Sequence, residues 1–303
     1  MKETQKLQSF DTAADVLPVR LRKAVLTLPE GVRAEAEEIR LRVGHRMSVL
    51  VDGHERMIPE IVETQDLEIL CDLAADFSRY AAVETLRYGY LPMRGGCRIG
   101  LCGTSVIKDG VNTNLRDFSS ASIRIAREYR GIGEELVRKL FEGERYCSTL
   151  ILSVPGGGKT TLLRDLIRCL SNGIGTDLPQ RVCVADERGE VGVCFHGVPQ
   201  MDLGCRTDIM DGCPKALAIP MLLRSMNPQI IAVDEITMQE DLRAISMAAH
   251  CGVGLLATIH AADVQELLQK PLYAELLSTH VFSKAVRIQP DGGKRTYQVE
   301  DLL

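Results

Sequence analysis

The sequence contains no tryptophan, and its aromatic residues together make up only 4% of the chain. The chain therefore has few aromatic rings on which a nucleic-acid-binding surface could stack bases. The chain also lacks an excess of positive charge, because its formal net charge is −5, which argues against a globally basic nucleic-acid coat protein. Glycine (26) and proline (12) occur at ordinary frequency in 303 residues, which excludes a collagen-like or wholly disordered chain.

Long apolar runs are also missing. The nearest to a membrane span is 244–262, but histidines, hydroxyl residues and two glycines interrupt it. We expect a helix followed by a buried strand there. The N-terminal segment has lysines but no apolar core of signal-peptide length, so we expect a cytoplasmic protein without a transmembrane segment.

None of the ten cysteines belongs to a C-x-x-C pair, so the sequence gives no support for a zinc knuckle or a thioredoxin-like site. Without a secretory signal, we expect ten reduced thiols, several of them buried as small hydrophobic side chains.

Hydrophobic periodicity divides the chain near residue 130. Before that point, 15–30 and 65–88 have helical spacing, whereas 39–51 and the glycine-rich 89–130 alternate like strands. This pattern predicts a smaller α+β domain over 1–130.

After residue 130 a helix is expected over 131–143, and then short, continuous apolar runs alternate with helices. Such runs, bounded by turns, indicate buried strands of a parallel sheet, so we predict an α/β domain over 131–303. The expected strands are 149–154, 181–186, 230–235 and 254–260, and the expected helices are 159–171, 212–226 and 239–251.

The segment 79–130 carries nine lysines and arginines against four acids. A solvated face and a surface that binds phosphate or a partner are both compatible with this charge, and the sequence leaves the choice open.

A phosphate-binding loop follows the first of these strands. The run Pro155-Gly156-Gly157-Gly158-Lys159-Thr160-Thr161 leads directly into a helix. Glycines let backbone N–H groups curl around phosphate oxygens, and the helix N-terminus adds its dipole. Lys159 is predicted to reach the β- and γ-phosphates and Thr160 to ligate Mg²⁺, although Ser153 replaces the usual first glycine of the pattern.

Acidic residues follow the predicted strand at 230–233. A P-loop requires an acid at the end of a neighbouring apolar strand to hold Mg²⁺ through water, and Asp234 has this position. Glu235 is predicted to polarise the attacking water. The alternative is an acidic N-cap for the helix at 239–251.

Other polar groups follow neighbouring strands. Glu187, within the acidic run 186–190, can orient water or Mg²⁺ or simply cap a loop. His260 can sense the γ-phosphate or be a structural histidine, and Arg206, with Arg224, is a candidate for stabilising charge on a neighbouring subunit's nucleotide or else a surface arginine.

With these motifs in place, the chain closely resembles the stage III sporulation protein AA family of endospore-forming bacteria, which is related to the ATPases of type II and type IV secretion. The resemblance covers nearly the whole chain and includes the runs GYLPMRGGCRIGLCGTSV, PGGGKTTLLRDLIR, VADERGEV, LLRSMNPQIIAVDEI and GVGLLATIHA.

The resemblance implies a RecA-like P-loop ATPase that uses ATP and Mg²⁺ to energise a channel between mother cell and forespore. It also implies a homo-oligomer, expected to be a hexameric ring, that meets the inner membrane through membrane-protein partners. By position, Lys159 and Thr160 match Walker A, Asp234-Glu235 match Walker B, and His260 matches the histidine box. Two departures from the secretion ATPases are Asp234, where they usually carry glycine, and Val253, where many have a first histidine.

Two other functions remain open at this stage. One is a nucleic-acid-dependent ATPase that binds through the basic segment 79–130, although nucleic acid is not the expected partner. The other is a nucleotide-binding scaffold without hydrolysis, against which Glu235 argues.

Overall fold

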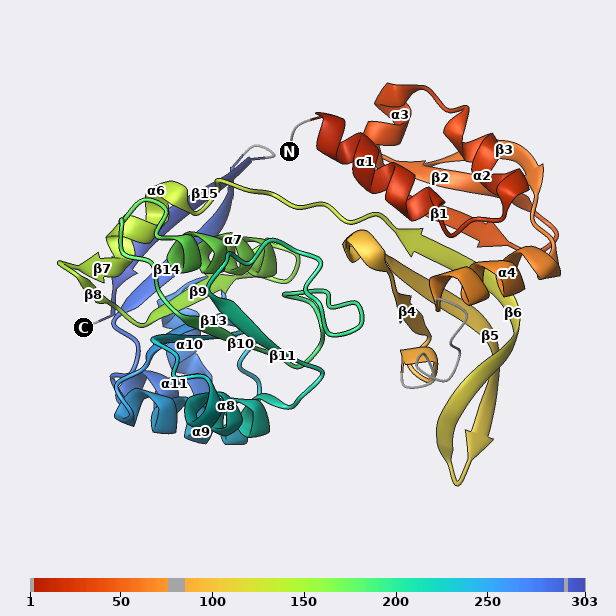
Figure 1. Cartoon of the computed structure of the whole chain (residues 1–303). Helices are drawn as coiled ribbons and strands as arrows, with labels where there is room; N and C mark the ends of the chain where they lie inside the picture. The colour runs from red at the N-terminus through yellow and green to blue at the C-terminus, as the bar shows by residue number, and fades with distance from the viewer. Residues whose placement is uncertain (1–2, 76–84, 292–293, 303) are drawn as a thin grey trace. The chain divides into compact units, whose positions relative to one another are not determined.

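The computed structural model describes the chain except residues 1–2, 76–84, 292–293 and 303. By their contacts the residues divide into two compact units (Figure 1). The first is Met1–Glu128 with Val193–Gln200, and the second is Tyr129–Gly192 with Met201–Leu303. A short segment from the middle of the second unit's sequence therefore groups with the first unit.

The first unit is an antiparallel sheet with four described α-helices packed on it. Its strand order is β3-β2-β1-β6-β5-β4, and one continuous apolar core lies between sheet and helices. The strands are β1 (Ala36–Arg42), β2 (Arg46–Val51), β3 (His54–Ile61), β4 (Tyr90–Pro92), β5 (Arg98–Lys108) and β6 (Val111–Arg124), and the helices are α1 (Glu3–Ala14), α2 (Val19–Leu26), α3 (Glu30–Glu35) and α4 (Thr64–Ala74), with a short 3-10 turn η1 (Arg94–Gly96).

Local sequence explains the breaks between these elements. The helix expected over 15–30 is interrupted, because Pro18 and Pro29 stand directly before the first residues of α2 and α3, where proline starts a helix but cannot continue one. Asp52-Gly53 and Asp109-Gly110 form hairpin turns in which both residues have positive φ, a conformation that Asp-Gly favours. Of the helix expected over 65–88, α4 is confirmed, and residues 76–84 lie outside the described part.

The second unit is an α/β fold whose sheet has the order β11-β10-β12-β13-β9-β14-β15. All neighbouring strands are parallel except β14 and β15, which form an antiparallel hairpin at one edge. The predicted fold class, an α/β domain with a parallel sheet preceded by an α+β part, is confirmed.

The elements of this unit follow in chain order. They are α6 (Glu134–Val137), η2 (Arg138–Leu140), β7 (Phe141–Glu142), β8 (Arg145–Tyr146), β9 (Thr149–Ser153), α7 (Lys159–Asn172), β10 (Val182–Asp186), β11 (Thr207–Asp211), α8 (Lys215–Ser225), β12 (Ile230–Val233), α9 (Gln239–His250), β13 (Gly254–His260), α10 (Val264–Gln269), α11 (Pro271–Ser278), β14 (Lys284–Asp291) and β15 (Lys294–Asp301).

Helices cover both faces of this sheet, with α6 and α7 on one side and α8 to α11 on the other (Figure 1). Alternate residues of each central strand enter opposite cores, so that Ile151 packs towards α7 while Leu150 and Leu152 pack towards α8 and α9. Apolar residues are required on both sides, which explains the continuous apolar runs in the sequence.

Several elements differ from expectation. The helix expected over 131–143 is a single turn, α6, followed by η2 and a two-stranded hairpin. The segment 207–211, for which no strand was predicted, forms the edge strand β11, and the hairpin of β14 and β15 was not predicted either. The segment 244–262 is the end of α9 followed by the buried strand β13, as expected, and no helix among the described residues is long and apolar enough to cross a membrane.

Candidate functional site

The P-loop connects β9 to α7 at the carboxyl edge of the sheet. Gly158 is the N-cap of α7 and has φ 99°, a left-handed conformation that a side chain would strain. Gly157 is required for space, because a Cβ there would lie 1.8 Å from Ser153 Oγ. Pro155 lies in the exposed part of the loop, and Thr161 lies in the first turn of α7, where backbone N–H groups have no partner within the helix.

Lys159 lies at the centre of the loop and is only 7% exposed. Its ammonium donates to the carbonyl oxygens of Ser153 (3.1 Å) and Val154 (3.3 Å) and to Nδ1 of His260 (2.7 Å). Burial lowers the pKa of Lys159, and the carboxylates of Asp234 and Glu235 oppose that shift. The lysine is thus a desolvated cation placed among acceptors that a phosphate group can replace.

Two threonines from different elements meet at Asp234, which directly follows β12. Thr160, in the first turn of α7, donates from Oγ1 to Asp234 Oδ2 at 3.1 Å. Thr258, buried on β13, donates from Oγ1 to Asp234 Oδ1 at 2.7 Å. A hydroxyl and a carboxylate are hard oxygen ligands, so this pair fits a Mg²⁺ ion that takes its remaining ligands from phosphate and water.

No group of three or more His, Cys, Asp and Glu side chains able to hold a metal occurs among the described residues.

Glu235 follows Asp234 with a φ of 44°, a conformation that costs free energy for a residue with a side chain. Its backbone N–H donates to Thr258 Oγ1 at 2.9 Å, which helps to hold this strained conformation. Its Oε1 lies 2.9 Å from His260 Nε2, and its Oε2 lies 2.9 Å from Nη1 of Arg188.

His260 connects Lys159 to Glu235. Because the Lys159 ammonium is a donor, Nδ1 of His260 must accept, which places the ring proton on Nε2, where it donates to Glu235. The structure therefore brings together Lys159, Thr160, Asp234, Glu235 and His260, which the sequence placed on separate strands and loops. Arg188 was missed as a partner of Glu235, and its place in the acidic run was the only available signal.

Asp186 has a different environment from the other acids. It is fully buried at the end of β10, and its carboxylate accepts backbone N–H groups of Glu190 (2.9 Å), Val191 (3.0 Å) and Gly192 (2.9 Å). Burial raises its pKa, and the three hydrogen bonds oppose the shift. This carboxylate fixes the loop after β10.

Glu187, the next residue, forms an ion pair with Lys215 at the start of α8. Lys215 is 4% exposed and also lies 3.9 Å from Asp241, which accepts the backbone N–H groups of Thr237 and Met238 before α9. Glu187 is therefore held by a buried cation, and its predicted catalytic role stays a prediction.

Arg206 lies at the other end of α7 from the P-loop. Its Nη1 donates to the carbonyl of Ser171 at 3.3 Å, and its backbone N–H donates to Ser171 Oγ at 2.7 Å. Ser171 follows Lys159 by twelve residues of α7. At a helical rise of about 1.5 Å per residue, the two ends are therefore roughly 18 Å apart. Arg206 does not reach the nucleotide site of its own chain, and its predicted action on a neighbouring subunit stays a prediction.

Most cations of the basic segment 79–130 are engaged within the chain, and Arg79 lies outside the described residues. Such contacts reduce the charge and the ring faces available to nucleic acid. The cation–ring contacts are Arg87 with Tyr88 (4.8 Å), Arg94 with Phe195 (5.7 Å) and Arg98 with Tyr90 (3.6 Å), and the ion pairs include Arg116–Asp117 (3.5 Å), Arg124–Glu38 (3.9 Å), Arg127–Glu35 (3.6 Å) and Arg130–Asp202 (3.3 Å).

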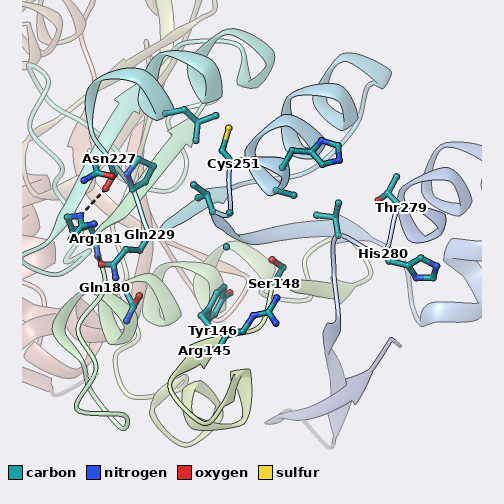
Figure 2. Close-up of a pocket in the computed structure, with 18 residues that line it drawn as sticks. Arg145, Tyr146, Ser148, Gln180, Arg181, Asn227, Gln229, Cys251, Thr279 and His280 are labelled. Carbon is teal, nitrogen blue, oxygen red and sulfur yellow. Dashed lines mark hydrogen bonds between the residues drawn. The ribbon is translucent and has the colours of Figure 1, made fainter.

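A cavity of about 750 Å³ lies at the opposite, amino edge of the sheet, among the loops that precede the strands (Figure 2). Val253, at the position of the missing first histidine, lines this cavity and not the nucleotide site. The basic side chains that line the cavity include Arg145 and Arg181. Because α8, α9 and α11 all end beside the cavity, these two arginines complement the negative ends of helices.

Comparisons with known proteins show what the chain is similar to. Residues 8–299 match the family model described as sporulation stage III, protein AA. The chain is 35% identical to the stage III sporulation protein AA of Bacillus subtilis over 93% of this chain and 92% of that protein.

The solved structures that are similar in fold include an ATPase and a pilus retraction motor. The ATPase DotB of Legionella pneumophila has a TM-score of 0.59 at 16% identity and covers 94% of this chain and 80% of its own. The pilus retraction motor PilT with bound ADP has a TM-score of 0.60 at 16% identity and covers 93% of this chain and 81% of its own.

Proposed function

The chain belongs to the sporulation stage III protein AA family, and we propose that it is the ATP-hydrolysing motor of a secretion-type channel complex between mother cell and forespore. The observation that carries the proposal is the set of contacts from Lys159 through His260 to Glu235. It joins a group that binds phosphate to a group that accepts a proton, and hydrolysis of a nucleotide needs both in one place.

Binding begins at the P-loop. Phosphate oxygens replace the carbonyl groups that now accept from Lys159, and the free N–H groups of the first turn of α7 donate to the same phosphates. Thr160 and Asp234 would hold Mg²⁺, which neutralises charge on the phosphates when it is bound.

Hydrolysis requires a carboxylate near the γ-phosphate. In our proposal Glu235 takes a proton from the attacking water as the water oxygen bonds to the γ-phosphorus. The bond from that phosphorus to the bridging oxygen of ADP then breaks. Each carboxylate oxygen of Glu235 accepts one hydrogen bond in the structure, from His260 or from Arg188, and keeps a second lone pair for the proton of the water. His260, which also accepts from Lys159, connects the lysine that binds phosphate to this carboxylate.

The proposal also includes an oligomeric state and partner proteins. We expect a homo-oligomeric ring, hexameric by analogy with related ATPases, that lies in the cytoplasm and meets the inner membrane through partner proteins of the channel. Arg206, exposed and far from its own P-loop, supports a site completed by a neighbouring subunit.

The proposal is tested by Mg-ATP binding and turnover of the full chain. Lys159→Ala removes a charge-assisted phosphate contact of about 2 kcal/mol, which is roughly a thirtyfold loss of affinity. Lys139→Ala, which removes an exposed lysine elsewhere in the same unit, is the matched control and should bind normally.

Three results would contradict the proposal. Equal affinities of wild type and Lys159→Ala would reject the P-loop. Tight binding without turnover by the wild type would indicate a scaffold. Strong stimulation by DNA or RNA that falls steeply with salt would favour the nucleic-acid-dependent ATPase.

A further inference from the structure

Arg295, near the start of β15, lies beside the P-loop. β14 pairs with β9 from Lys284 opposite Thr149 to Arg287 opposite Leu152. β14 then continues to Asp291, beyond the carboxyl end of β9, where the P-loop begins. The pairing of Pro290 with Arg295 places Arg295 in this overhanging part of β15.

The orientation of Arg295 follows from strand periodicity. Residues 295, 297 and 299 share one face of β15. Tyr297 and Val299 pack against the core that contains α7, and burial raises the pKa of Tyr297. The same face therefore directs Arg295 towards the side of the sheet where α7 begins.

Two distances place the guanidinium of Arg295 at the loop itself. A Cβ added to Gly158 would lie 2.9 Å from Cζ and Nη1 of Arg295, so the guanidinium packs directly over the N-cap of α7. Nη2 also lies 3.5 Å from the carbonyl oxygen of Gly156, which is a long and weak hydrogen bond.

The guanidinium has no carboxylate partner among the described residues, and its side chain is exposed. A guanidinium presents several N–H donors in a planar fork that matches phosphate oxygens. Nearly all of these donors remain available at a point where a bound phosphate meets the start of α7.

We propose that Arg295 is a second cationic contact for the phosphates of the nucleotide, supplied by the C-terminal hairpin of the same chain. The inference rests on the proposed function, because it assigns a further residue to the same nucleotide site. Lys159 then binds the phosphates from inside the loop, and Arg295 binds them from the side of β15.

The test compares wild type, Arg295→Ala and Arg295→Lys in the full chain by displacement of a fluorescent ATP analogue. The competitors are Mg-ATP and inorganic tripolyphosphate. We expect Arg295→Ala to weaken both competitors by about tenfold, the order expected for one charge-assisted contact, and Arg295→Lys to recover part of the loss. Arg145→Ala removes an exposed arginine without an ion-pair partner in the described residues, at the opposite edge of the sheet, and should not change either affinity.

The outcomes separate this inference from the proposed function. If Lys159→Ala loses Mg-ATP but Arg295→Ala binds as the wild type does, the contact by Arg295 is refuted and the P-loop stands. If Arg295→Ala weakens Mg-ATP but not tripolyphosphate, the guanidinium contacts the base or ribose and the inference is wrong. If the wild type binds neither competitor, the proposed function fails.

Discussion

Removing the carboxylate of Asp186 distinguishes a structural role from a catalytic one for the acidic run after β10. Its Oδ2 accepts the N–H groups of Val191 and Gly192, and its Oδ1 accepts that of Glu190. In Asp186→Asn the amide oxygen can retain two of these donors, but the amide nitrogen then faces the third. One charge-assisted bond is lost and one buried donor is left unpaired, which costs about 2 kcal/mol.

Asp186→Ala leaves all three backbone N–H donors without an acceptor, so its loss of stability is larger, about 4 kcal/mol. The measurement is urea denaturation followed by circular dichroism, in which both variants should shift the midpoint without a large change in slope. Asp208→Asn, the same chemical change at an exposed position of the neighbouring strand β11, is the control and should shift it little.

The catalytic alternative makes the opposite prediction. If Asp186→Asn unfolds at the same urea concentration as the wild type, yet hydrolyses Mg-ATP far more slowly, then the carboxylate acts on the nucleotide and our structural assignment is wrong.

Two further predictions concern assembly and acid stability. Arg206→Ala should retain Mg-ATP binding but lose hydrolysis, and mixing it with Lys159→Ala should restore partial activity; an inactive mixture in co-assembled rings would count against action in trans. Hydrogen bonds from Arg42 and Ser48 lower the pKa of Glu55 to about 2, so its stabilising effect is present above the unfolded-state value of 4.5 and is lost as pH falls towards 2. For this partly exposed pair the effect is about 1 kcal/mol, and Glu55→Gln, measured by denaturation at pH 7 and pH 3, should reduce the difference in stability between the two pH values by up to that amount; an unchanged difference would refute the assignment.

Much of the fold was predictable because its signals are local. The apolar runs of β9, β10, β12 and β13 are continuous since both faces of these strands are buried. The P-loop was predictable for the same reason, because glycines, lysine and threonine are adjacent in sequence and lie between a strand and a helix.

Other features depend on contacts between distant residues. β11 is a polar edge strand that only its pairing with β10 reveals. The pairing of Arg188 with Glu235 and the approach of Arg295 to Gly158 join segments that are far apart in the sequence. Asp186 and Glu235 follow similar apolar strands, and only the three backbone donors around Asp186 distinguish them.

The central claim is that Glu235 is the base in a site where Lys159 binds the phosphates. Its most direct test is the identity of the labelled nucleotide recovered from Glu235→Gln after incubation with Mg-ATP. We expect the variant to bind Mg-ATP with near-normal affinity and to retain ATP, with turnover slowed at least ~100-fold, whereas the wild type yields ADP. Recovery of ADP from the variant at the wild-type rate would contradict the account and move the base elsewhere, with Glu187 as the next candidate.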